Sequence, residues 1–118
     1  MLPANFPYAV QALGNVSGTA VVLDASTGNV FTCTLTGATD FAVKNLKPGQ
    51  AMFVLSEQNV VGGFASTFNG TGGQTITSPT TADTNFGNLG GGDKCFWILV
   101  GLTPTTAAVV NRQGDAGA

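Results

Sequence analysis

Few residues in this sequence have side chains suited to catalysis. There is no histidine, which removes the usual general base and the most common metal ligand. Glu57 is the only glutamate, and Asp24 and Asp40, which flank neighbouring turns, are the nearest candidates for a carboxylate pair. Aspartates that cap turns are far more common than such pairs, so the sequence predicts a protein that is not an enzyme.

Oxygen ligands for a cation occur in the irregular segment 78–94. Asp83 and Asp93 offer carboxylates there, with Asn85 and Asn88 between them, but their spacing does not match a calcium-binding loop. Residues 90–94 are glycine-rich, yet they lack the ending of a phosphate-binding loop and run into a strand. We therefore expect no cofactor and no metal ion, with calcium at this segment as the weaker alternative.

The two cysteines and the single tryptophan are typical of a protein core. Cys33 and Cys95 lie in apolar segments, where a reduced cysteine behaves as a small hydrophobic residue. A disulfide between them is the alternative, and two cysteines alone cannot hold a metal ion. Trp97 lies in the most apolar segment, so we expect it in the core rather than on a sugar-binding surface.

Short strands separated by turns would position these residues. Residues 19–24 are β-branched and apolar, and residues 30–36 alternate between apolar side chains and threonine, as in a half-buried strand. Residues 37–40 predict a turn between this strand and the next, and residues 47–50 predict a tight turn with proline and glycine. Residues 95–102 are apolar at both parities, which predicts a central strand covered on both faces.

This pattern predicts an all-β fold, an antiparallel β-sandwich or barrel of about eight short strands. We expect an extended N-terminal arm over residues 1–15, because Pro3 and Pro7 oppose a helix, with a frayed terminus as the alternative. A β domain follows over residues 16–111. The long loop 78–94 lies within this domain, and residues 112–118 form a polar tail. The predicted core residues are Phe31, Leu35, Phe41, Val43, Phe53, Leu55, Trp97 and Leu99.

Charged residues make up only 8% of the chain, against about 25% in ordinary soluble domains. A surface with so little charge favours association. Either its Thr, Ser, Asn, Gln and Gly residues keep it solvated, or other subunits cover much of it, and we expect the second, a homo-oligomer. Lys44 and Lys47 are the nearest approach to a basic cluster, which argues against nucleic acid binding. No apolar run reaches 18 residues and the N-terminus lacks a signal peptide, so we expect no membrane contact and folding in the cytoplasm.

One stretch resembles a known family. The residues that carry the resemblance are Gly28, Asn29, Phe31, Leu35, Thr36 and Gly37, then Asn45, Leu46, Gly49 and Gln50, then Gly62 and Gly63. Their order and spacing are similar to the small Gly/Thr-rich β domains of tailed-bacteriophage virion proteins, over residues 19–63 and more weakly through Phe68. Such domains build capsid surfaces and tail fibres, usually as trimers.

The resemblance implies a structural or adhesive role in a virion. The chain begins with Met1 and ends at Ala118, so we expect a complete small protein that decorates (cements) a capsid by binding its major capsid protein. The alternative is a tail-fibre or receptor-binding adhesive module. The candidate partner-binding residues are Phe6 and Tyr8, as anchors in the arm, and Phe86 in the long loop.

Overall fold

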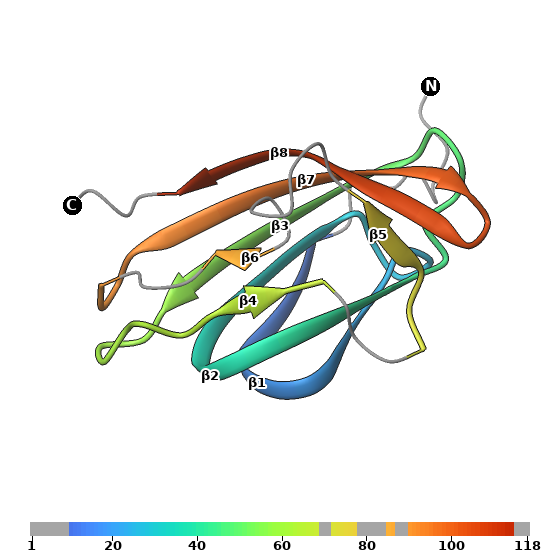
Figure 1. The fold of residues 1–118 in the computed structure, drawn as a ribbon. Coiled ribbons are helices and arrows are strands. Elements are labelled where there is room, and N and C mark those ends of the chain that lie inside the picture. Colours follow the sequence, from blue (N-terminus) through green and yellow to red (C-terminus); the bar gives the residue numbers. More distant parts are fainter. Residues whose placement is uncertain (1–9, 69–71, 78–84, 87–89, 115–118) are drawn as a thin grey trace, which may run out of the picture.

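The computed structural model describes residues 10–68, 72–77, 85–86 and 90–114, and within these ranges the chain is all-β and has no helix. No helix there is long and apolar enough to cross a membrane. The strands are β1 (Val10–Asp24), β2 (Val30–Lys44), β3 (Ala51–Gln58), β4 (Ser66–Thr67), β5 (Thr75–Thr77), β6 (Asn85–Phe86), β7 (Lys94–Thr103) and β8 (Thr106–Gly114) (Figure 1). The all-β prediction is confirmed.

The strands form one mixed sheet in the order β5-β8-β7-β3-β2-β4-β6, and β1 pairs with β2 beside this path. β2 runs parallel to β1, β3 and β4, and β5 runs parallel to β8. The pairs β3–β7, β7–β8 and β4–β6 are antiparallel. The prediction of an antiparallel sheet is therefore wrong for the parallel pairs, and the described strands do not close into a barrel.

The parallel pairs arise because β1 and β2 each bend back, so that the start and end of each strand lie at the same side of the molecule (Figure 1). Residues 25–29 then need only to connect β1 to β2, and residues 45–50 connect β2 to β3. Val10 lies beside Val30, and Val30 beside Phe53, as successive turns of a short coil. No repeat of fixed length in the sequence predicts this coil.

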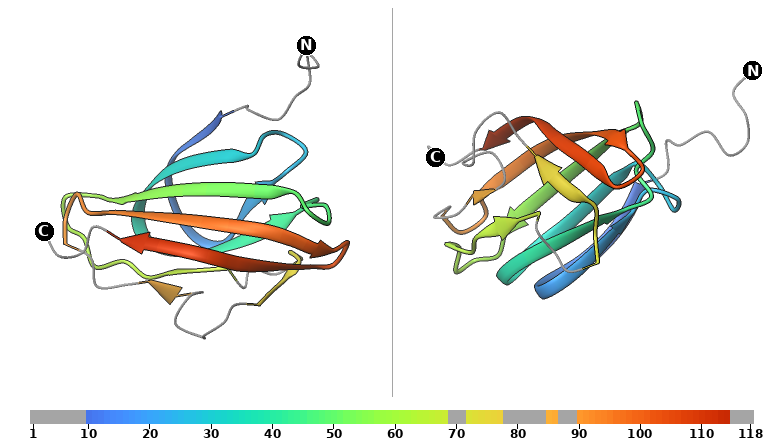
Figure 2. Two further views of the ribbon diagram at one scale, coloured as in Figure 1. Left: turned by 90° about the horizontal axis from the view of Figure 1, so that it is seen from above. Right: turned by 45° about the vertical axis from the view of Figure 1, so that its right-hand side comes forward.

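The bends fold the sheet over on itself (Figure 2). The first half of β2 pairs with β3 and its second half with β4, and the β1–β2 register shifts between these halves. Gly14 and Gly18 have positive φ angles of 73° and 89°, which glycine tolerates best. A Cβ atom on Gly37 would lie only 3.1 Å from that of Ser17. The turn predicted at residues 37–40 is therefore wrong, because these residues form a bend inside β2.

The core fills the space inside the folded sheet. Six of the predicted core residues are at most 1% exposed: Phe31, Leu35, Phe41, Val43, Trp97 and Leu99. Phe68 links the two layers, since its ring centroid lies 5.3 Å from that of Phe41 and 4.8 Å from that of Trp97. These aromatic contacts add to the apolar burial that stabilises the fold.

Phe53 and Leu55 are the two core predictions that are wrong. The parallel register places Phe53 beside Val30 and Val54 beside Phe31, so Val54 faces the core. Met52 and Val54 are fully buried, whereas Phe53 and Leu55 are half-buried on the opposite face. The tight turn at residues 47–50 is confirmed, with the Gln50 N–H donating to the Lys47 carbonyl at 2.9 Å.

The boundaries of the irregular segments also differ from those expected. β1 begins at Val10, so residues 10–15 pair in the sheet, and residues 1–9 lie outside the described part of the chain. β6 occupies two positions of the segment expected as a long loop, and β8 extends to Gly114, into the expected tail. The described part of the expected N-terminal arm, from Val10 onward, is therefore a strand of the sheet.

Candidate functional site

The most distinctive feature of the surface is an apolar face on the outside of the sheet. Its central row contains Val30, Phe53 and Ile98, which are direct neighbours on β2, β3 and β7. Leu55 and Phe96 form the next row, and Val100 lies on the other side of the central row. We call this the outer sheet face and define it as Val10, Val30, Phe53, Leu55, Phe96, Ile98 and Val100.

The centre of the outer sheet face is an aromatic pair. The rings of Phe53 and Phe96 stack with their centroids 6.0 Å apart and their planes at 18°. Both side chains are half-buried, and Val10 at the start of β1 is 59% exposed. The prediction of a central strand at residues 95–102 is confirmed, because β7 lies between β3 and β8. Its outer side chains are only half-buried, so the described residues cover it fully on the core side alone, and the prediction that both faces are covered is wrong for that part of the chain.

Polar residues border this face at one end. Lys94 Nζ lies 3.7 Å from Glu57 Oε2, and both side chains are about half exposed, so the ion pair contributes little to stability. Thr32 and Thr34 face the same side on β2 and are half-buried. The face thus has an apolar centre and a polar border, which is typical of a surface that makes contacts.

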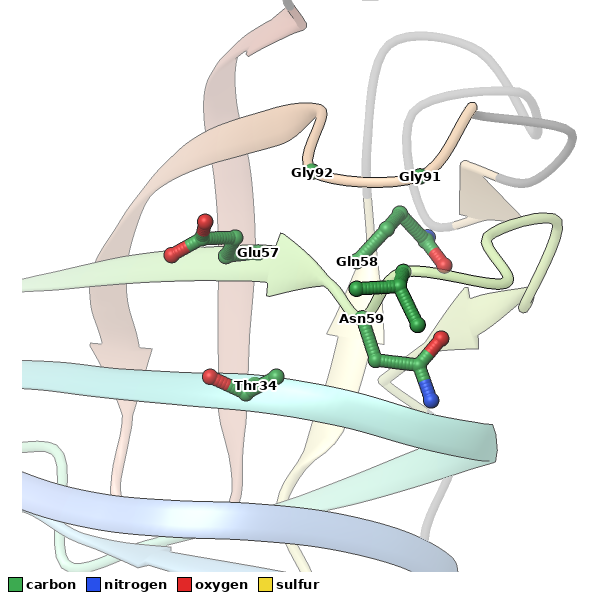
Figure 3. Close-up of a pocket in the computed structure, with 7 residues that line it drawn as sticks. Thr34, Glu57, Gln58, Asn59, Gly91 and Gly92 are labelled. Atoms are coloured by element: carbon green, nitrogen blue, oxygen red, sulfur yellow. The ribbon is translucent and has the colours of Figure 1, made fainter.

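A shallow pocket of about 510 Å³ lies beyond this polar end, between β2, β3 and the turn that precedes β7. Figure 3 shows that the side chains of Glu57 and Gln58 point in different directions. Gln58 is occupied structurally, since its amide donates to the Phe64 carbonyl at 2.8 Å and accepts from the Phe64 N–H at 3.0 Å. The pocket therefore holds no converging pair of reactive groups.

Asp24 and Asp40 do not meet. In the β1–β2 register Asp24 lies beside Lys44, whereas Asp40 lies beside Thr19, at a different level of the strands. The Asn45 amide and Ser26 hydroxyl and N–H donate to the Asp24 carboxylate, which holds its pKa below the ordinary value of 3.8. Asp40 accepts a hydrogen bond from Thr67. The structure therefore contradicts a carboxylate pair and supports the turn-capping role for Asp24.

The proposed calcium ligands fall partly outside the described residues, which is where Asp83 and Asn88 lie. Asp93 is 9% exposed, and its carboxylate accepts from the Gly90 N–H at 2.9 Å, closing the turn before β7. Asn85 lies in β6. Among the described residues no group of three acidic, cysteine or histidine side chains could hold a metal ion.

Cys33 and Cys95 are both free and buried, in agreement with the first of the two interpretations. Ser56 lies beside Cys33 on one side and beside Cys95 on the other, so one strand separates the cysteines. Two strand spacings amount to roughly 9–10 Å, which is beyond the Cα separation that a disulfide bridges. Burial raises the pKa of the Cys33 thiol to about 12, so it is almost entirely protonated at neutral pH.

Of the predicted partner-binding residues, Phe6 and Tyr8 lie outside the described part of the chain. Phe86 lies in β6, at the end of the strand path, where it pairs with Ser66 of β4. The structure therefore places Phe86 in a strand and not at a loop tip. Sequence reasoning missed the outer sheet face, although residues 95–102 carry its signal as apolar side chains at both parities.

Comparison with known proteins gives no relative: no protein family, curated protein or solved structure matches this chain.

Proposed function

We propose that this protein is a structural subunit of a bacteriophage particle, a capsid decoration (cement) protein that binds the major capsid protein and stabilises the shell. In this proposal it folds in the host cytoplasm, assembles as a homo-oligomer, with a trimer favoured, and acts without catalysis, cofactor or nucleic acid. The resemblance of residues 19–63 to virion β domains gives the biological setting.

The observation that carries the proposal is the scarcity of charge on the surface. The chain has four basic and six acidic residues for an accessible surface of 6030 Å². A typical domain of this size carries about three times as many charged residues. Charge keeps proteins apart in solution, so a surface that lacks it is suited to permanent contacts. The half-buried apolar face beside β3 and β7 supports the same role.

The N-terminal segment is proposed to make the capsid contact, with Phe6 and Tyr8 as anchors. Each aromatic side chain buries around 150–250 Å² on docking, which at about 25 cal/mol per Å² sets an upper limit of several kcal/mol per anchor. Ordering the segment costs roughly 1–2 kcal/mol per residue, so one copy binds weakly. Three segments on one trimer would bind together and give firm attachment.

The second candidate is a tail-fibre or receptor-binding module. The observation that favours it is the open pocket of about 510 Å³, whose border carries the oxygens of Thr34, Glu57 and Asn59. Oxygen-rich shallow pockets suit sugar hydroxyl groups, but Asn59 Oδ1 already accepts from the Val61 and Gly62 N–H groups. The pocket therefore offers few free polar groups, and we place this candidate second.

Two measurements test the proposal. The first is the stoichiometry of this protein in purified particles that contain it, which should approach that of the major capsid protein. A copy number far below this would contradict a decoration role and favour the tail candidate. The second compares loading onto capsids that lack the protein.

For the loading experiment the variant Phe6→Ala/Tyr8→Ala should fail to bind capsids while keeping its fold and oligomeric state. Asn5→Ala, in the same segment but without loss of an aromatic ring, is the matched control and should load fully. Full occupancy by the double variant would contradict the proposed anchors and move the search for the attachment site to segment 78–94.

A further inference from the structure

Two valine side chains stand out from the surface between β3 and β4. Val60 is 94% exposed and its neighbour Val61 is 73% exposed. The other large apolar residues that are exposed in the described part of the chain reach at most 59%. Adjacent apolar side chains exposed to this degree mark a contact site more often than single ones do. We call residues 59–63, which contain both valines, the valine turn.

Hydrogen bonds hold the valine turn in one conformation. The Asn59 side chain accepts from the Val61 and Gly62 N–H groups at 2.9 and 3.2 Å. Behind the turn, Gln58 is 2% exposed, and its amide bonds both the N–H and the carbonyl group of Phe64. A turn that is fixed in advance loses little conformational entropy on binding, which favours a contact role over a loose connection.

The turn that precedes β7 supports the valine turn from the side (Figure 3). The Gly92 N–H donates to the carbonyl groups of Gln58 and Asn59, both at 3.1 Å. A Cβ atom on Gly91 would overlap the Val60 carbonyl oxygen, so the two turns pack closely. Together they lie at the end of the molecule to which β3 points (Figure 1).

The valine turn does not reach the centre of the outer sheet face on its own chain. β3 is extended from Phe53 to Gln58, and a rise of about 3.3 Å per residue puts roughly 17 Å between them. The valine turn begins beyond Gln58, and its bonds to Gly92 hold it there. The two valines therefore need a partner on another molecule.

A second copy of the chain offers a partner of matching chemistry. The centre of its outer sheet face consists of the stacked Phe53 and Phe96, with Ile98 beside Phe53, and all three side chains are half-buried. Neither this centre nor the valine turn contains a charged residue, so no charge loses water when they meet.

The size of the outer sheet face also favours a turn as its partner. The face lies on β1, β2, β3 and β7, which at about 4.8 Å per strand spacing gives a width of roughly 15 Å. A similar length gives an area far below the about 800 Å² that each partner contributes to a standard interface. Two such faces packed together would therefore not hold a dimer, whereas a protruding turn matches the area.

A lipid surface is the competing partner for two exposed valines. Segments that bind lipid surfaces combine apolar residues with Lys or Arg, which attract anionic headgroups. The valine turn contains neither, and Lys94 at the start of β7 is paired with Glu57 at 3.7 Å. The charge pattern therefore favours a protein contact.

We infer that the valine turn of one copy packs on the outer sheet face of the next, with Val60 and Val61 against Phe53, Phe96 and Ile98. The contact joins two different surfaces, so it repeats head to tail and closes into a ring when the rotation between copies allows it. In a ring, two contacts must break to release one copy, which compensates for the small area of each. This contact is the interface of the proposed homo-oligomer, and it rests on that part of the proposed function and not on the capsid.

Sedimentation equilibrium of Val60→Ser/Val61→Ser tests the valine turn. Both residues are exposed in the single chain, so the variant should keep the circular dichroism spectrum of the parent. We expect its subunit dissociation constant to rise about a hundredfold, roughly tenfold for each valine removed from an apolar contact. Val22→Ser, which removes an exposed valine from β1, is the matched control and should associate like the parent. Association of the double variant with the parent's constant would overturn the inference.

Cysteines on different copies identify the surface that receives the turn. Val60→Cys protein is mixed with Ile98→Cys protein, left to exchange subunits and oxidised mildly. The native Cys33 and Cys95 do not compete, because both are buried. We expect a disulfide between the two variants and none between Val60→Cys and Val22→Cys proteins. Failure of the first pair to couple would overturn the inference. Rapid coupling of Val60→Cys protein with itself would also overturn it, because two turns would then meet symmetrically.

Vesicles of neutral and anionic phospholipid test the competing partner. We expect the parent protein to stay in solution. Vesicle binding that is lost in Val60→Ser/Val61→Ser, without a change in association, would overturn the inference and assign the turn to a lipid surface.

Failure of the inference and failure of the proposed function are distinguishable. An oligomer that survives the loss of both valines overturns this interface and leaves the proposed homo-oligomer standing. A parent protein that is monomeric throughout overturns both, and the copy number in particles then still tests the capsid role.

Discussion

The two faces of the sheet formed by β2, β3 and β7 are both apolar, yet only the inner one is closed. Phe31, Val54 and Trp97 on the inner side are at most 1% exposed, whereas Phe53 and Phe96, one position away on the same strands, are half-buried. The inner face is covered because β1 and β2 bend and fold the sheet over on itself (Figure 2). Phe41 and Val43 belong to the same buried cluster as Phe31, Val54 and Trp97. No described element crosses the outer face.

This difference shows that hydrophobicity does not by itself distinguish a core position from a contact position. Alternation separates the two faces, but the bend in the sheet decides which of them becomes the interior. An apolar face left outside then needs another partner, either a further segment of the chain or another molecule. The predictions that follow compare the two faces in order of decreasing effect.

The largest difference is expected in thiol reactivity. Cys33 on the inner face should react with a thiol reagent only when the protein opens, whereas a cysteine introduced by Thr34→Cys, one position along on the outer side, should react in the native state. With an opening free energy of about 5 kcal/mol, the two labelling rates differ by on the order of several thousandfold. Rapid labelling of Cys33 in the native parent protein would show that the inner face is open to solvent.

Stability should separate two phenylalanines that lie on neighbouring strands. Phe31→Ala removes a ring that is 1% exposed, and it should lower the free energy of unfolding by about 3–5 kcal/mol. Phe53→Ala removes a half-buried ring and should cost roughly 1–2 kcal/mol. Urea unfolding of both variants checks the ranking. Equal losses would mean that the outer face is as closed as the core.

The smallest effect concerns a turn outside both faces. Asn45 and Ser26 stabilise the charged Asp24 carboxylate in the folded state, so its folded pKa is lower than its unfolded value. Its contribution is therefore present above the ordinary pKa of 3.8 and is lost as the pH falls through the lower folded value. Asp24→Asn should be less stable than the parent at neutral pH, and this difference should shrink below about pH 4. A constant difference down to pH 2 would contradict the linkage.

Much of the fold class could be predicted from local sequence signals. The threonine alternation of residues 30–36 and the proline–glycine turn at residues 47–50 identify an all-β chain, and six of the eight proposed core residues are buried. These signals act within a few residues. The parallel pairing of the strands could not be predicted from such local signals. It depends on bends at Gly14, Gly18 and Gly37 that resemble ordinary turns in the sequence.

The candidate site was harder to predict for the same reason. The parity of Phe53 depends on its pairing with Val30, which follows from the coil and not from the sequence of β3. The separation of Cys33 and Cys95 likewise requires the knowledge that β3 lies between their strands. Apolar residues at both parities in residues 95–102 indicated two apolar faces, but not that the described strands cover only one.

The central claim is that the sparsely charged surface exists for assembly, and the mass of the purified protein in solution tests it most directly. Sedimentation equilibrium at micromolar concentration should give an oligomer, with a trimer of about three times the 11.9 kDa chain mass favoured. A single species of 11.9 kDa over the whole concentration range would contradict the claim.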